Sequence, residues 1–147
     1  MAKSIEQMAG ELADREAIRE LPLKYCDCVW RNDMSGIVDL FAVDGEFITK
    51  GQKREHRASG REGLAKLYGG ITQGPLTPRP YIHNHVIDLA GSGRATGRCY
   101  VELRNLKKDM EWVGAGWYAD EYVKVGEEWK FKSRTFRTVY MSVMPGQ

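Results

Sequence analysis

Residues 81–106 read YIHNHVIDLAGSGRATGRCYVELRNL, and this stretch decides the fold. Its two halves are rich in β-branched and aromatic residues, and Gly91-Ser92-Gly93 between them is typical of a hairpin turn. We therefore expect two antiparallel strands, the second running over residues 95–106. Two more strands are predicted at residues 112–125 and 129–141. The second half of the chain is thus predicted to be an antiparallel meander.

The first thirty residues predict helices. Ser4 and Gln7 have the spacing of a capping box, which opens a short leading helix. Asp14 can cap a second helix, whose apolar stripe runs from Ile18 to Val29. Pro22 lies inside this stripe, and an interior proline removes one backbone hydrogen bond. We therefore expect a kink or a restart of the helix at Pro22.

Shorter elements are expected before the meander. In chain order, the signals are a Ser35 helix cap, an Asp44-Gly45 turn, a strand at 46–49, a Ser59 capping box, a Gly69-Gly70 helix stop and a loop over 72–80. Helices followed by a meander indicate an α+β fold. Helices packed on one face of a curved, cone-shaped antiparallel sheet would leave a conical cavity between the two layers.

Composition excludes several classes of protein. A chain of 147 residues predicts one domain over 1–147, and its net charge of +2 gives no case for nucleic-acid binding. There is no run of apolar residues long enough for a membrane span and no apolar signal core, so a cytoplasmic protein is expected. Cys26, Cys28 and Cys99 are an odd set of thiols, predicted to be free. We expect no metal site and no cofactor.

The predicted strand at residue 81 carries two histidines. Strict alternation puts His83 and His85 on one face and Asn84 on the other. Histidine titrates near neutrality, which suits it to proton transfer, although either residue could simply be a hydrogen-bonded core residue. Asn84 would reach the histidine face only if a bulge or another register turned it inward.

Four local patterns follow one another along nearly the whole chain. They are AIREL at 17–21 with Lys24-Tyr25 and Asp33; LFAVDGEF at 40–47; NHVIDL at 84–89 with RATGR at 94–98; and WYADEYV at 117–123 with WKF at 129–131 and Arg134. In this order they resemble the SnoaL-like branch of the nuclear transport factor 2-like superfamily, which has the cystatin-like fold. That branch resembles cofactor-free lyases (scytalone dehydratase, hexachlorocyclohexane dehydrochlorinase and bile-acid dehydratase), and is similar to ketosteroid isomerases and polyketide cyclases.

The resemblance implies roles for several residues. Tyr25 matches a pocket tyrosine and His83 the catalytic histidine of the bile-acid dehydratase, whereas Arg134 matches the catalytic arginine of the dehydrochlorinase. Tyr118 falls where related pockets place an aromatic residue. Two positions depart from the family pattern. The helix aspartate that pairs with the catalytic histidine falls on Trp30, and the histidine position of the dehydrochlorinase falls on Pro80. The usual dyad is therefore expected to be broken or relocated.

These observations predict a cofactor-independent lyase. It would abstract a proton and expel water or a small aldehyde from a bulky, largely apolar, oxygenated aromatic or polycyclic molecule. The predicted catalytic residues are His83, Tyr25, Tyr118 and Arg134, and the predicted substrate-binding residues are His85, Asn84, Trp30 and Cys99. His85 competes with His83 as the base. The alternatives are a ring double-bond isomerase of the ketosteroid-isomerase type and a non-catalytic ligand-binding module. Related lyases imply a homo-oligomer, with a trimer favoured over a dimer.

Overall fold

The computed structural model of this chain describes residues 2–71 and 76–142, which form three helices and one six-stranded sheet. The helices are α1 (Ile5–Trp30), α2 (Met34–Asp39) and α3 (Gly60–Ile71). The strands are β1 (Phe41–Lys50), β2 (Glu55–Ser59), β3 (Pro78–Gly91), β4 (Arg94–Asn105), β5 (Glu111–Val125) and β6 (Glu128–Met141). Within the described ranges, no helix has both the length and the apolar character needed to cross a membrane.

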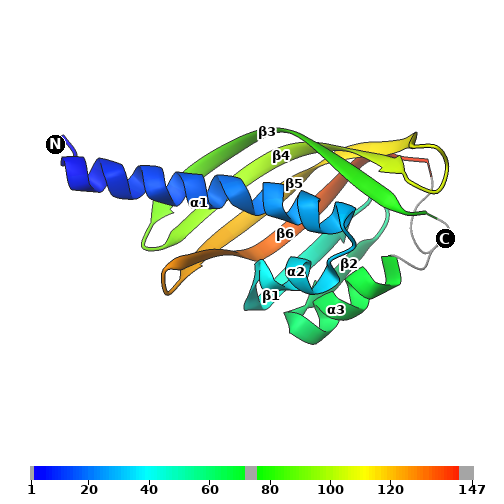
Figure 1. Ribbon diagram of the computed structural model, residues 1–147, viewed down its shortest axis with the longest axis horizontal. Coiled ribbons are helices and arrows are strands. Elements are labelled where there is room, and N and C mark those ends of the chain that lie inside the picture. Colours follow the sequence, from blue (N-terminus) through cyan, green and yellow to red (C-terminus); the bar gives the residue numbers. More distant parts are fainter. Residues whose placement is uncertain (1, 72–75, 143–147) are drawn as a thin grey trace.

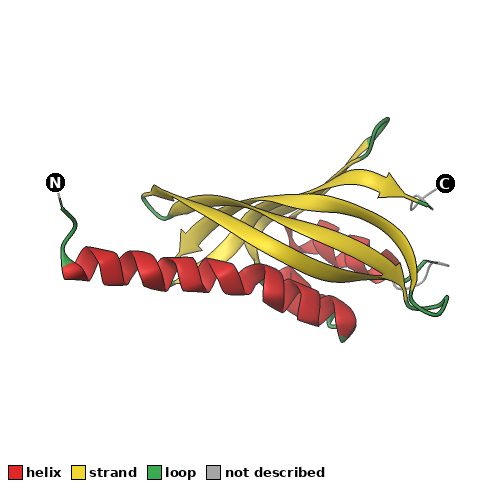
Figure 2. Ribbon diagram, turned by 90° about the horizontal axis from the view of Figure 1, so that it is seen from above, coloured by secondary structure: helices red, strands yellow, loops and turns green. Residues whose placement is uncertain are grey.

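The strands lie in the order β2-β1-β6-β5-β4-β3. Neighbouring strands are antiparallel, except that β1 pairs with β6 in parallel. Figure 1 shows α1 crossing in front of the strands, with α2 and α3 beneath it near β1 and β2. Figure 2 shows the twist of the sheet along the length of α1. The predicted α+β fold is confirmed, and the meander of β3 to β6 has the predicted bounds to within a few residues.

One continuous helix replaces the two that were predicted at the N-terminus. The capping box is confirmed: Gln7 N donates to Ser4 Oγ at 3.1 Å, and Ser4 N donates to Gln7 Oε1 at 2.8 Å. The predicted restart of the helix at Pro22 is wrong, because α1 continues to Trp30. Pro22 itself belongs to the buried face of the helix, so tertiary packing on both sides of it compensates for the lost backbone bond.

Asp14 does not cap a helix; it joins α1 to the sheet. Its Oδ1 atom accepts hydrogen bonds from Trp129 Nε1 at 2.8 Å and from Lys124 Nζ at 3.2 Å. These donors lie on either side of the turn between β5 and β6. The contact holds the first half of α1 against a part of the sheet that is more than a hundred residues away in sequence.

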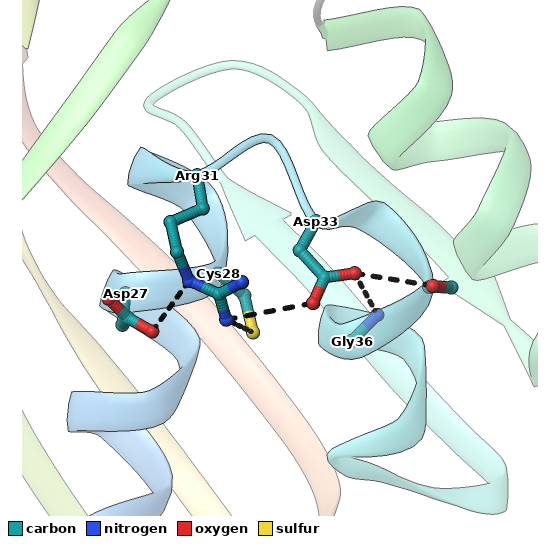
Figure 3. A network of polar contacts seen from close by, with 6 residues as sticks. Asp27, Cys28, Arg31, Asp33 and Gly36 are labelled. Carbon is teal, nitrogen blue, oxygen red and sulfur yellow. Dashed lines mark hydrogen bonds and ion pairs between the residues drawn. The ribbon is translucent and has the colours of Figure 1, made fainter.

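The chain turns sharply between α1 and α2 (Figure 3). Asp33, not Ser35, is the N-cap of α2, and its Oδ1 atom accepts a hydrogen bond from Gly36 N at 2.9 Å. A carboxylate at this position satisfies a free amide of the first turn, which explains the choice of aspartate. Arg31 pairs with Asp27 at 2.9 Å and with Asp33 at 3.6 Å. The network fixes the direction in which the chain enters α2.

Three other boundaries differ from the predictions. Strand β1 runs through the predicted turn at Asp44-Gly45, where a register shift against β6 takes up the irregularity. Helix α3 passes Gly69-Gly70 and extends to Ile71, whereas β3 begins at Pro78, inside the predicted loop. Residues 72–75 of that loop lie outside the described residues. The edge strand β2 was not predicted.

The core fills the space between α1 and the inner face of the sheet. Alternate residues of β4 and β5 point into it, among them Cys99, Val101, Tyr118 and Tyr122. Helix α1 contributes Ile18, Leu21, Tyr25 and Cys28 to the same layer. The residues with chemical potential in this core are therefore the ones that face inward from β3 to β6.

Candidate functional site

A β-bulge in β3 separates the two histidines. Ile82 pairs with Val101 and His85 pairs with Cys99, so His83 and Asn84 together stand opposite the single residue Tyr100. A bulge inserts one residue into the alternation, so the residues on its two sides no longer keep strict period two. The prediction that His83 and His85 share a face is therefore wrong.

His83 lies on the outer face of the sheet. Its Nε2 atom is 2.8 Å from Glu102 Oε2, and its side chain is 54% exposed. Asn84 is exposed as well, so the bulge does not turn its side chain into the core. His83 and Asn84 therefore lie apart from the core, in which Tyr25, Tyr118, Cys99 and Arg134 are buried.

His85 is partly buried and faces the core. Its Nε2 atom lies 2.9 Å from the hydroxyl oxygen of Tyr122, and the same hydroxyl donates to Asp120 Oδ2 at 2.9 Å. Burial, together with the positive charges of Arg134 and Arg19, lowers the pKa of His85 to about 4. The imidazole is consequently neutral near pH 7, which is the state that can accept a proton.

Arg134 is the fully buried cation of this cluster. Its guanidinium carbon lies 3.6 Å from the ring centre of Tyr118, 4.3 Å from that of Tyr25 and 4.8 Å from that of Phe131. One terminal nitrogen donates to Cys99 Sγ at 3.2 Å. Aromatic faces attract cations, so the rings stabilise a charge that burial would otherwise disfavour. The structure thus brings the predicted residues Tyr25, Tyr118, Cys99 and Arg134 together.

Asp120 supplies the counter-charge to Arg134. Its Oδ1 atom is 3.3 Å from Arg134 Nε, and both side chains are fully buried. Burial raises the pKa of Asp120 to about 6, although Arg134 and the Tyr122 hydroxyl act in the opposite direction. At neutral pH the carboxyl group is therefore ionised, and the interior holds a buried ion pair.

Several buried polar atoms of this cluster have no hydrogen-bond partner among the described residues. Two of them, His85 Nδ1 and one terminal nitrogen of Arg134, have no hydrogen-bond partner in this part of the chain, whereas Asp120 Oδ1 and Arg134 Nε make no hydrogen bond but face each other in the ion pair. Unpaired buried polar atoms are rare in folded proteins because each costs about 1–3 kcal/mol. The presence of two such atoms marks this part of the core as the candidate site, since a bound polar group could satisfy His85 Nδ1 or the terminal nitrogen of Arg134.

Tyr25 and Tyr68 extend the cluster toward α3. Their hydroxyl oxygens lie 2.9 Å apart, and the Tyr25 ring meets the Tyr118 ring edge-on at 5.9 Å. Burial raises the pKa of both hydroxyl groups well above the usual value for tyrosine. Both phenols are therefore neutral, and because one hydroxyl proton is used in the bond between them, one of the two can donate to an oxygen of a ligand.

Trp30 contacts the beginning of β3. Its Nε1 atom donates to the carbonyl oxygen of Pro80 at 2.9 Å, and Cys26 Sγ donates to the same oxygen at 3.3 Å. The Trp30 ring packs edge-on against Tyr81. Both side chains thus fix the end of α1 to β3 through a backbone oxygen.

Sequence reasoning missed Asp120 and Tyr122 as site residues. The available signal was the alternation of Tyr118, Asp120 and Tyr122 in one strand, which places a carboxylic acid on the inward face of a central strand. A buried acid in that position needs a partner, and Arg134 lies directly opposite it in β6. The pairing was visible only once the register of β5 and β6 was known.

A hollow of about 740 Å³ lies on the other face of the sheet. Charged side chains dominate its lining, among them Glu46, Lys50, Arg98, Glu121, Lys132 and Arg137. Such a surface is not suited to a largely apolar ligand. In the described part of the chain, no three histidine, cysteine or acidic side chains gather in a way that could hold a metal ion.

Comparisons with known proteins agree on the fold. The SnoaL-like domain family matches residues 10–135 of the sequence. No curated protein sequence matches the chain. A nuclear transport factor 2-like protein with a cystatin-like fold from Novosphingobium aromaticivorans has a TM-score of 0.80 at 20% identity, over 100% of this chain and 94% of that one.

Two other similar structures carry descriptions of an activity. The hexachlorocyclohexane dehydrochlorinase LinA-type3 from Novosphingobium barchaimii has a TM-score of 0.77 at 21% identity, over 93% of this chain and 94% of that one. A protein proposed to be a scytalone dehydratase, from Novosphingobium aromaticivorans, has a TM-score of 0.74 at 23% identity, over 95% of this chain and 98% of that one. At these identities the likeness establishes the fold alone.

Proposed function

The chain belongs to the SnoaL-like family, and from that premise we propose that it is a cofactor-independent lyase whose active site is the buried cluster around His85 and Arg134. The substrate is a bulky, largely apolar, oxygenated aromatic or polycyclic compound. The observation that carries the proposal is the unpaired His85 Nδ1, held in a core that also contains a buried guanidinium.

In this proposal His85 is the general base. Its imidazole is neutral and partly buried, and the charge of Arg134 is close enough to lower its pKa. A neutral imidazole nitrogen without a partner can take a proton from a carbon or a hydroxyl group of the substrate. His83 is not chosen, because its side chain is exposed and paired with Glu102.

Arg134, Tyr118 and Tyr25 would act on the substrate oxygen. One terminal nitrogen of Arg134 has no partner among the described residues, and the tyrosine hydroxyls are neutral donors. Donors fixed in a dry core stabilise a developing negative charge better than water does. Cys99 holds a terminal nitrogen of Arg134, so its thiol would orient the guanidinium.

Two eliminations are compatible with these roles. In a dehydration, His85 removes a proton from carbon, a carbon–carbon double bond forms, and hydroxide leaves from the neighbouring carbon with a proton from a tyrosine or from the imidazolium. In an aldehyde elimination, His85 removes the hydroxyl proton. The carbon–oxygen double bond of the released aldehyde then forms, the carbon–carbon bond breaks, and its electron pair passes to a carbonyl on the adjacent carbon as an enolate, which takes its proton from the imidazolium.

The test is conversion of aromatic and steroid-like diols by the full-length chain, read by high-resolution mass spectrometry. A lyase gives a product lighter by one water or one small aldehyde, whereas an isomerase gives a product of unchanged mass. His85→Gln should lower kcat/KM by about 100-fold or more, the contribution typical of a general base. His83→Gln is the matched control and should leave kcat/KM unchanged. Full turnover in His85→Gln would contradict the proposal.

A binding module is the second candidate. The contact between Trp30 and Pro80 favours it, because these are the two positions at which the chain departs from the acid–base pattern of the lyases that it resembles. A binding module predicts saturable binding of ring compounds, measured by calorimetry, with no change in their mass after long incubation.

We also propose that the chain forms a homo-oligomer, with a trimer favoured, through the outer face of the sheet. Four large aromatic side chains on that face, Tyr81, Tyr100, Trp112 and Tyr140, are 40–52% exposed. Trp112 and Tyr140 stack at 5.5 Å. Exposed apolar patches of this kind are typical of interfaces between subunits. Sedimentation equilibrium gives the mass directly, and a monomer at micromolar concentration would contradict the proposal.

A further inference from the structure

The contacts of Tyr122 determine which nitrogen of His85 carries the proton. The Tyr122 hydroxyl lies within 2.9 Å of both Asp120 Oδ2 and His85 Nε2. A phenol has one proton to donate, and an ionised carboxylate can only accept. The hydroxyl proton therefore belongs to the bond with Asp120, and the other bond must be donated by His85 Nε2–H.

The protonation state of the other imidazole nitrogen, Nδ1, follows from this assignment. A neutral imidazole carries one N–H, so His85 Nδ1 is an unprotonated acceptor. This is the atom that is buried without a hydrogen-bond partner among the described residues. The charges that act on His85, on Arg134 in β6 and Arg19 in α1, are both positive and keep the ring neutral. The lone pair of Nδ1 is thus free for a ligand.

The surroundings hold Asp120 in its ionised form. Arg134 Nε lies 3.3 Å away, and this fully buried cation needs a negative partner in the core. Asp120 and Tyr122 are two apart in β5 and both face inward, so one rigid strand carries both groups. Arg134 thus keeps Asp120 ionised, Asp120 accepts the Tyr122 proton, and the Tyr122 oxygen accepts from His85 Nε2.

Gly97 makes room for the Tyr122 hydroxyl. A Cβ atom at this position would lie 2.9 Å from the hydroxyl oxygen and 2.8 Å from the carbonyl oxygen of Val86, closer than side chains pack in proteins. The position of the phenol is therefore built into β4 as well as into β5.

We propose that Asp120 and Tyr122 form a positioning relay that fixes His85 in the tautomer protonated at Nε2 and so presents Nδ1 to the substrate. The relay replaces the helix aspartate of related lyases with an acid from the sheet. Its role in catalysis depends on the proposed function, whereas the tautomer of His85 does not and can be measured without a substrate.

The Asp120→Asn variant should reverse the tautomer. Arg134 Nε–H favours the amide oxygen of the asparagine, which turns the amide NH₂ toward Tyr122. The phenol oxygen then accepts from the amide, and its own proton points at His85 Nε2. The imidazole proton must move to Nδ1, and the base is lost, as happens in catalytic triads when the acid becomes an amide. We expect kcat/KM to fall by about 100-fold or more.

The experiment is nitrogen-15 NMR of the full-length chain with labelled histidine, at pH 7, with His85 assigned by its absence from His85→Gln. The wild type should show a protonated Nε2 and a bare Nδ1, and Asp120→Asn should show the opposite. Because Asp120→Asn removes the counter-charge of Arg134, a second variant, Tyr122→Phe, is measured as well, and it keeps both charges. In Tyr122→Phe, the two nitrogen shifts should converge, since nothing fixes the tautomer. Glu102→Gln, beside His83, is the control and should leave the His85 signals unchanged.

A wild-type proton at Nδ1, or unchanged His85 signals in a folded Tyr122→Phe variant, would overturn the relay. The expected tautomers combined with full activity of Asp120→Asn would leave the relay standing and reject His85 as the base. Failure of the relay and failure of the proposed function are therefore separable.

Discussion

Trp30 Nε1 donates a hydrogen bond of 2.9 Å to the carbonyl oxygen of Pro80. These are the two positions at which the lyases that the chain resembles would hold an aspartate and a histidine. An indole and a backbone oxygen cannot transfer a proton near neutral pH, so the contact only fastens α1 to β3. A buried acid and a partly buried imidazole of this chain, Asp120 and His85, lie on the sheet and are joined through the Tyr122 hydroxyl.

The buried pair of Arg134 and Asp120 should show strong coupling in stability. Arg134→Met leaves an uncompensated carboxylate in the core and should lower the free energy of unfolding by about 3–5 kcal/mol at pH 7. The double variant Arg134→Met/Asp120→Leu removes both charges and should recover most of that loss. Urea denaturation of the wild type, of Arg134→Met, of Asp120→Leu and of the double variant measures the coupling. Additive effects of the two substitutions would show that the pair does not interact.

The pH dependence of stability should separate His85 from Asp120. The pKa of His85 is about 4 in the folded chain and 6.5 ordinarily, so the folded chain binds this proton less tightly and stability rises as pH increases from 4 to 6.5. The pKa of Asp120 is about 6 against an ordinary 3.8, so its contribution falls as pH rises from 3.8 to 6. In the wild type the two trends oppose each other.

A variant that lacks Asp120 should show the pH dependence of stability due to His85, and a variant that lacks His85 should show the one due to Asp120. Between pH 4 and 6, Asp120→Asn should gain stability with increasing pH relative to the wild type, and His85→Gln should lose it. Each difference should be on the order of 2 kcal/mol. Urea midpoints at half-unit pH intervals measure both. Parallel curves for the two variants would contradict the assigned pKa shifts.

Gly97→Ala tests the space reserved for Tyr122. The added methyl group meets the Tyr122 hydroxyl and the Val86 carbonyl, so we expect a loss of about 1–3 kcal/mol in unfolding free energy. Gly10→Ala is the matched control, because a Cβ there meets nothing within 4 Å on an exposed helix. It should stabilise the chain by about 0.5–1 kcal/mol. Equal effects of the two substitutions would mean that β4 shifts enough to accommodate the added methyl group.

Asp14→Ala tests the attachment of α1 to the sheet. It leaves the Trp129 indole N–H unpaired in a mostly buried position and removes the Lys124 contact. Hydrogen bonds to charged groups contribute about 1.5–3 kcal/mol, which is the expected loss. Glu16→Ala removes an exposed ion pair on the same helix and should leave the free energy of unfolding nearly unchanged. Hydrogen exchange should show faster opening of α1 in Asp14→Ala only.

The pattern of apolar residues was sufficient to predict the order of helices and strands, and the α+β fold. It failed where tertiary contacts outweigh local signals. Pro22 remains helical because it lies on the buried face of α1 between Leu21 and Tyr25, and Asp14 binds Trp129 instead of capping a helix. Local spacing contains no information about either contact.

The candidate site was predictable only in part. Tyr25, Tyr118, Cys99 and Arg134 come together in the core, and His85 joins them through Tyr122 and Asp120. The choice between His83 and His85 could not be made from alternation, because one bulge reverses it. The bulge depends on how β3 pairs with β4, and the sequence of β3 alone does not determine that pairing.

The parallel pairing of β1 with β6 has a consequence for synthesis on the ribosome. Strand β6 begins at Glu128 and lies between β1 and β5, so the last strand to be made is the one that joins the two parts of the sheet. Until then, β1 and β2 form one hairpin, and β3 to β5 form another unit with an open edge. Arg134 arrives with β6, so Asp120 has no counter-charge earlier. The nascent chain therefore has to remain protected from aggregation at this edge until β6 emerges, and the buried ion pair of Asp120 and Arg134 forms at the same moment.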